Sequence, residues 1–192
     1  MANSCFTNYV VKGPKENVAR LKETLLSIKD PENPSDMDPW AGYFLQAIGK
    51  DPNRDLDNCG WIPNYESAYT LSEDGTELRF WVESKWTRIE CLETVVAEVF
   101  DVTVWFMEEE LGCDVFCTND TDHTVFPQYV ILDGNEAEMD YYTPDEARKE
   151  VAAILERENL LPEGYDKMTI EEIGEYVYGH LDDVWMHVAK AA

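Results

Sequence analysis

The alternation of apolar and polar residues predicts a strand followed by a helix at the start of the chain. Aromatic and β-branched residues dominate residues 4–12 and favour an extended conformation there. Gly13-Pro14 then interrupts the pattern, and Pro14 suits the first turn of a helix. Apolar residues follow at helical spacing from Val18 to Ile28, so we expect a helix that ends before Pro31.

Residues 30–64 show no regular period. Five prolines interrupt this stretch, at positions 31, 34, 39, 52 and 63. Proline is a strong breaker of both helices and strands, so we expect irregular structure with one short helix after Asp38-Pro39. We interpret the stretch as an insertion that packs on the surrounding domain and not as a domain of its own.

Strands return after the insertion. The segments 65–71 and 78–86 carry strand residues, and Asp74-Gly75 between them is a strong signal for a hairpin turn. In the second segment Leu78, Phe80, Val82 and Trp86 are expected on one face. Three charged residues and one tryptophan are expected on the other face: Arg79, Trp81, Glu83 and Lys85.

A helix and three further strands are expected next. Thr87 and Glu90 have the spacing of a capping box, which opens a helix by satisfying its first amide groups. Apolar and β-branched runs then predict strands at 102–107, 113–118 and 125–132.

Two helices are expected to end the chain. One begins at Thr143-Pro144, and the other begins at Thr169 with an apolar stripe that reaches Val188.

This order of elements predicts an α+β fold. The segment β-α-β-β-α-β corresponds to the ferredoxin-like split unit, an antiparallel sheet with helices on one face. We therefore expect a ferredoxin-like α+β domain at residues 1–140, with the irregular insertion at about 30–64. Residues 141–192 are expected to form a C-terminal helical pair that packs on this domain.

Several short motifs resemble a known family. Asn3-Ser4-Cys5, the Gly13-Pro14 pair before the first helix, and Asp101-Val102-Thr103-Val104 after the second helix are similar to YubB-type ferredoxin-like proteins. The resemblance covers roughly residues 2–134. It implies a small cytosolic protein carried by plasmids, phages or conjugative elements. The family has no established activity, so the resemblance supplies no catalytic residue.

Composition narrows the classes of partner. The 192 residues include 15 Lys and Arg against 40 Asp and Glu, a net charge of -25. This excess of acid disfavours direct binding to nucleic acid and to anionic membranes. No apolar run approaches the roughly 18 residues of a membrane span, and the first residues do not form a secretory signal. Five scattered cysteines fit a reducing compartment, so we expect a cytoplasmic protein.

The strongest acidic bias lies at residues 101–140, which contain eleven acidic residues and no Lys or Arg. Such a field steers a basic partner and raises its rate of association. An alternative is a solvated acidic edge that prevents strands of different molecules from pairing. The candidate partner-binding residues gather around a predicted hairpin: Glu108, Glu109, Glu110, Asp114, Asp120 and Asp122.

The sequence gives weaker evidence for metal binding or catalysis than for an acidic partner-binding surface. His180, Asp183 and His187 have the spacing that places three side chains on one face of a helix, and such a set could bind a transition metal. We favour the alternative, an ordinary helix surface with two histidines beside an acid. Cys113 and Cys117 lack the second pair of ligands that a structural zinc site needs. We therefore predict no catalytic residue and no cofactor.

These observations favour a non-enzymatic cytosolic interaction protein of a mobile genetic element, whose acidic surface recognises a basic protein partner. The alternative is a small metal-dependent enzyme with its site near the insertion or on the last helix. A third possibility is an accessory subunit that associates through exposed aromatic residues such as Trp40, Trp61 and Trp81.

Overall fold

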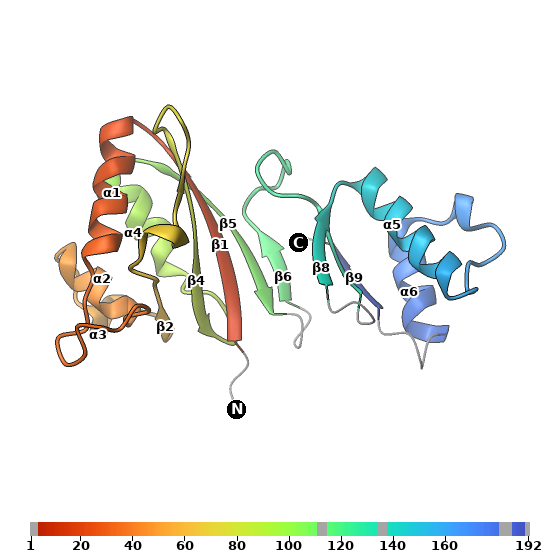
Figure 1. Ribbon diagram of the computed structural model, residues 1–192, viewed down its shortest axis with the longest axis horizontal. Helices are drawn as coiled ribbons and strands as arrows, with labels where there is room; N and C mark the ends of the chain where they lie inside the picture. The colour runs from red at the N-terminus through yellow and green to blue at the C-terminus, as the bar shows by residue number, and fades with distance from the viewer. Residues whose placement is uncertain (1–3, 111–114, 134–137, 181–185, 191–192) are drawn as a thin grey trace. The chain divides into compact units, whose positions relative to one another are not determined.

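The chain divides into two compact units (Figure 1). Unit 1 comprises residues 1–120 and unit 2 comprises residues 121–192. The boundary expected at residue 140 lies twenty residues further along the chain. The computed structural model describes four stretches of the chain, residues 4–110, 115–133, 138–180 and 186–190.

Unit 1 is an α+β unit built on one antiparallel sheet. Among the described residues the sheet has six strands in the order β2-β4-β1-β5-β6, and β3 also pairs with β4. The strands are β1 (Ser4–Lys12), β2 (Gly60–Trp61), β3 (Thr70–Leu71), β4 (Glu77–Lys85), β5 (Thr103–Glu110) and β6 (Val115–Thr118). The helices are α1 (Lys15–Ser27), α2 (Ala41–Ala47), α3 (Pro52–Asp55) and α4 (Cys91–Phe100), with a 3-10 turn η1 (Glu66–Ala68).

The helices of unit 1 cover one face of its sheet (Figure 1). Alternation along the strands sends every second side chain, such as Tyr9 and Val11 of β1, into the core beneath the helices. Phe44 of α2 is fully buried in this core and stacks with Phe100 of α4, with 6.4 Å between ring centroids. Residues 30–64 therefore supply part of the core of unit 1, although their sequence has no regular period.

Unit 2 is a smaller α+β unit. Three described strands pair antiparallel in the order β8-β7-β9: β7 (Tyr129–Asp133), β8 (Glu138–Tyr142) and β9 (Met186–Lys190). Its helices are α5 (Pro144–Arg157) and α6 (Ile170–His180), with a 3-10 turn η3 (Tyr165–Lys167). A core of apolar side chains includes Ile131, Val151, Leu155 and Ile173.

Two expectations about the C-terminal part were wrong. The strand expected at 125–132 is not part of the sheet of unit 1, since β7 pairs with β8 and β9. The last helix was expected to reach Val188, but α6 ends at His180 and β9 follows. A short β-branched and apolar segment fits either a helix or a strand, and its pairing with β7, about 55 residues earlier, decides the outcome. The C-terminal part is therefore not purely helical.

Among the described residues, no helix combines the length and the apolar content that crossing a membrane requires.

Candidate interaction surface

The expected acidic surface around residues 108–122 is largely internal. Glu108, Glu109 and Glu110 of β5 expose only 3%, 4% and 6% of their surface, and Asp120 is buried too. Asp122 is exposed, and Asp114 lies outside the described residues. The prediction that these side chains together present an exposed acidic site is therefore wrong. Glu108 shows the physical reason, because the fold brings hydrogen-bond donors from other elements to its carboxylate.

Glu108 forms the centre of a buried polar cluster. It accepts hydrogen bonds from the backbone N–H of Arg88 (2.9 Å) and from Nη1 of the same residue (3.3 Å). The thiols of Cys5 and Cys117 donate to its two carboxylate oxygens, at 3.6 and 3.2 Å. The guanidinium of Arg88 also lies 4.1 Å from the ring centroid of Phe106. Glu108 thus joins β1, β5, β6 and the segment before α4, which is a structural role.

The thiols near this cluster are poor nucleophiles. Burial and the neighbouring Glu108 raise the pKa of Cys5 and of Cys117 to about 12. Burial and the carboxylate of Asp57 raise the pKa of Cys91 to about 11. All three side chains are therefore protonated at neutral pH, whereas nucleophilic attack requires the thiolate.

Thiol labelling tests this description. In the folded protein at pH 8, iodoacetamide is expected to modify Cys59, which is exposed, and to leave Cys5 and Cys117 unmodified, because Cys5 is buried, Cys117 is half-buried and both thiols are protonated. Peptide mass spectrometry after timed quenching measures each site separately, and labelling in 8 M urea is the control for full access. Equal rates at Cys5 and Cys59 in the folded protein would contradict the buried cluster.

The described residues do not place a metal site. No group of three or more His, Cys, Asp or Glu in the described part of the chain is arranged to hold a metal ion. His180 ends α6, and His187 lies in β9. Asp183 lies outside the described residues. The three candidates therefore do not share one continuous helix, which was the premise of the metal hypothesis.

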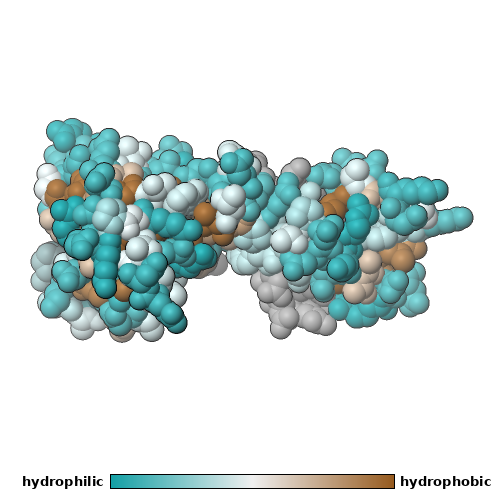
Figure 2. All heavy atoms as spheres, turned by 90° about the horizontal axis from the view of Figure 1, so that it is seen from above, coloured by the Kyte–Doolittle hydropathy of each residue, from teal (hydrophilic) through white to brown (hydrophobic). Residues whose placement is uncertain are grey.

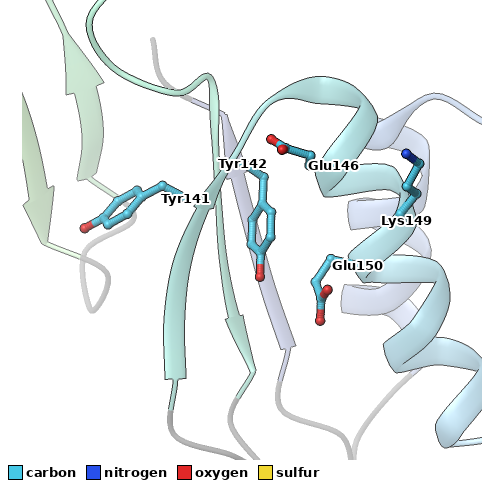
Figure 3. A pocket seen from close by; sticks show the side chains of 5 residues that line it. All are labelled: Tyr141, Tyr142, Glu146, Lys149 and Glu150. Atoms are coloured by element: carbon cyan, nitrogen blue, oxygen red, sulfur yellow. The ribbon is translucent and has the colours of Figure 1, made fainter.

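Unit 2 contains a shallow hollow of about 340 Å³. Figure 3 shows its lining side chains: Tyr141, Tyr142, Glu146, Lys149 and Glu150. Tyr142 points into the space between β8 and α5, whereas Tyr141 points away from α5 (Figure 3). Glu146 is already engaged in capping α5, where it accepts hydrogen bonds from Thr143. These polar groups do not converge on one point, so the hollow lacks the arrangement of a catalytic or ligand-binding site.

The face of the sheet opposite the helices of unit 1 is called the outer face below. Unlike the hollow in unit 2, it brings aromatic and acidic side chains side by side. Antiparallel pairing places Glu83 of β4 between Trp61 of β2 and Phe6 of β1. Neighbouring strands lie about 4.8 Å apart, so the carboxylate has an aromatic side chain on each side. We call these three residues the Trp61–Glu83–Phe6 row.

Gly60 allows this row to form. A Cβ atom on Gly60 would lie 2.6 Å from the carbonyl oxygen of Glu83 and 2.7 Å from Cδ1 of Ile89. Both approaches are closer than side chains tolerate, so glycine lets β2 reach the edge of β4. The backbone of β2 then presents Trp61 beside Glu83.

The row is accessible and its charge is predominantly negative. Phe6 exposes 44% of its surface, and its ring lies 6.1 Å from that of Trp81 on the same face. The hydroxyl of Ser4 donates to Glu83 at 2.6 Å and orients the carboxylate.

Asp38 contributes further negative charge near the row. Burial and the nearby carboxylates of Asp36 and Glu83 raise the pKa of Asp38. The ammonium of Lys85 lies 5.7 Å from the Trp61 ring, so the edge also carries one cation. Figure 2 shows that hydrophilic side chains cover most of the visible surface of each unit, with small hydrophobic patches between them.

Sequence patterning found part of this surface and missed the rest. The expected placement of Arg79, Trp81, Glu83 and Lys85 on one face of β4 is confirmed by the strand pairing and by the alternation of burial along β4. A tryptophan among charged residues was the available signal. The expected placement of Trp86 on the apolar face is wrong, because β4 ends at Lys85 and Trp86 is 49% exposed. Phe6 and Trp61 were not recognised as neighbours of Glu83, because they come from strands 77 and 22 residues away in the sequence.

Fold and surface together define an α+β protein whose described residues hold an aromatic and acidic sheet face and no metal cluster. Comparison of the chain with protein-family models, with curated proteins and with solved structures finds no match in any of the three.

Proposed function

We propose that this protein is a non-enzymatic interaction module that binds a basic segment of a partner protein through the Trp61–Glu83–Phe6 row. The observation that carries the proposal is a carboxylate held between two aromatic side chains on the outer face of unit 1. This proposal keeps the basic partner expected from the sequence and moves its docking site from the buried acids of β5 to β1, β2 and β4.

A cationic side chain fits the chemistry of the row. An ammonium or guanidinium group near the face of an aromatic ring gains roughly 0.5–1 kcal/mol at an exposed site, and an adjacent carboxylate adds an ion pair. Arginine suits such a site better than lysine, because its planar guanidinium stacks on a ring while its N–H groups reach the carboxylate. The side chain of Glu83, oriented by Ser4, supplies the acceptor.

The overall charge supports the same partner. Residues 1–120 contain 10 basic and 23 acidic residues, a net charge of -13. A field of this sign attracts a basic segment and repels a phosphate backbone. Asp38 brings a further carboxylate close to Glu83.

Glu83→Gln tests the role of the row directly. Isothermal titration with a twelve-residue peptide of alternating arginine and glycine is expected to show binding that weakens about fivefold in this variant, because the ion pair is lost while the shape is kept. Glu98→Gln is the matched control, since Glu98 is exposed on α4 and its replacement removes the same charge. Raising the ionic strength from 0.05 to 0.5 M should weaken the wild type more than Glu83→Gln.

Two outcomes would overturn the proposal. Equal affinities of Glu83→Gln and Glu98→Gln would mean that the peptide follows net charge and not the row. Binding of a twelve-residue single-stranded oligothymidylate in place of the peptide would mean that the aromatic side chains stack on nucleic-acid bases, as they do in single-strand binding proteins.

The proposal also covers the type of fold in unit 1 and the kind of genetic element that carries the protein. A ferredoxin-like core in unit 1, of the YubB type, is supported by the chain order β1-α1-β4-α4-β5 and by the central place of β1 between β4 and β5. In this proposal β2 is the remaining strand of the split unit, and the protein acts in the cytoplasm as part of a mobile genetic element.

A further inference from the structure

Trp86 has an unusual backbone conformation. Its φ angle is 67°, in the left-handed region, and its side chain is 49% exposed. Bulky residues rarely adopt positive φ, because Cβ then lies too close to the following carbonyl oxygen. A tryptophan that is both strained and half exposed is a reason to look for a function at that position.

The surrounding hydrogen bonds impose this conformation. The N–H of Thr87 donates to the carbonyl oxygen of Lys85 at 2.8 Å, which closes a three-residue turn with Trp86 at its centre. Such a γ-turn with positive φ is rare and strained. The side-chain amide of Asn58 donates to the same carbonyl at 2.8 Å and to that of Thr87 at 2.6 Å, and the hydroxyl of Ser84 donates to Thr87 at 2.7 Å.

The turn lies at the same end of the sheet as the Trp61–Glu83–Phe6 row. Lys85, the residue before Trp86, pairs with Ser4 at the start of β1, and its ammonium lies over the ring of Trp61. Trp86 therefore follows β4 directly, three residues beyond Glu83 of the row. Three residues of strand span about 10 Å, so an exposed indole at this position is close enough to Glu83 for one extended cationic segment to reach both.

We infer that Trp86 is an anchor residue for the basic segment, a role that rests on the proposed function of the row. The turn fixes the backbone at Trp86 before the partner arrives, so little backbone entropy is lost there when the partner binds. Tryptophan is among the residues most often found as energetic hot spots of protein interfaces. The strain at Trp86 and its exposure then have one common explanation.

A pair of substitutions separates the strain from the binding role. Trp86→Ala and Trp86→Gly both remove the indole, and both are expected to weaken binding of the arginine–glycine peptide about tenfold, a loss typical of an anchor residue. Their stabilities should differ, because glycine adopts positive φ without strain and alanine does not. The urea midpoint of Trp86→Gly is therefore expected to exceed that of Trp86→Ala. Trp86→Tyr should retain most of the affinity.

The remaining outcomes distinguish this inference from the function on which it rests. Leu161→Ala, at an exposed apolar residue of unit 2, is the control and should bind as the wild type does. If Glu83→Gln weakens binding while Trp86→Gly does not, the anchor role is wrong and the row remains. If neither variant changes the affinity, the proposed function fails. A urea midpoint of Trp86→Ala equal to that of Trp86→Gly would contradict the strain at this position.

Discussion

Replacing Glu108 by alanine is expected to lower the free energy of unfolding by about 3–5 kcal/mol, the range found when one partner of a buried ion pair is removed. Glu108 is 3% exposed, and the side chain of Arg88 opposite it is 19% exposed. Without the carboxylate, the guanidinium stays largely buried and keeps only its longer contacts with Glu93 (3.6 Å) and Glu90 (3.9 Å). The thiols of Cys5 and Cys117 lose their acceptor in the same variant.

Urea unfolding followed by circular dichroism measures this loss. Glu98→Ala is the matched control, since it removes an exposed glutamate of the same unit and should change the free energy by no more than about 0.5 kcal/mol. Glu108→Gln retains an acceptor for the backbone N–H of Arg88 and should fall between the two. If Glu108→Ala and Glu98→Ala unfold at the same urea concentration, the buried pair does not stabilise unit 1.

Phe44→Ala is expected to cost a similar amount, about 3–5 kcal/mol, because it empties a fully buried aromatic position. Phe44 belongs to α2, within the irregular stretch 30–64, and stacks on Phe100 of α4. The loss combines the free energy of transferring the ring from water with the cost of the cavity that remains. The measurement therefore tests whether this stretch is part of the core of unit 1.

Met37→Ala provides the comparison for Phe44→Ala. Met37 lies in the same stretch but is 54% exposed, so its replacement should change the free energy of unfolding by less than about 1 kcal/mol. Equal losses in the two variants would mean that residues 30–64 contribute little core, contrary to the burial of Phe44. Stability is again measured by urea unfolding.

The local part of the fold could be predicted because it is encoded in short periodic patterns. The strand at 4–12 matches β1, and the buried residues Val18, Leu21 and Leu25 of α1 are those of the expected apolar stripe. The expected start of a helix at Thr143-Pro144 matches the capping box of α5. Each of these signals is complete within about ten residues of sequence.

The remainder depends on contacts between distant segments. A run of three glutamates indicates an exposed surface when it is considered alone, yet Glu108 finds its partners 20 and 103 residues away, in Arg88 and Cys5. The segment of β9 likewise becomes a strand because β7 is available to pair with it. Such long-range pairings leave no local periodicity.

The proposed interaction surface likewise combines features that short sequence patterns predict with features that depend on contacts between distant segments. The alternation of β4 places Glu83 on the face away from the core, and the sequence predicts this. The aromatic neighbours of Glu83 follow from the strand order β2-β4-β1, which becomes known only with the sheet. The strained turn at Trp86 has no sequence signature, since neither glycine nor asparagine marks its positive φ.

The division of the chain after Asp120 also separates its chromophores. Five of the six tryptophans, at positions 40, 61, 81, 86 and 105, belong to unit 1, whereas six of the ten tyrosines lie between residues 129 and 178, in unit 2. Intrinsic tryptophan fluorescence therefore reports mainly on unit 1, and tyrosine absorbance is weighted towards unit 2. A single unlabelled sample can thus reveal whether the two units unfold together or in separate steps.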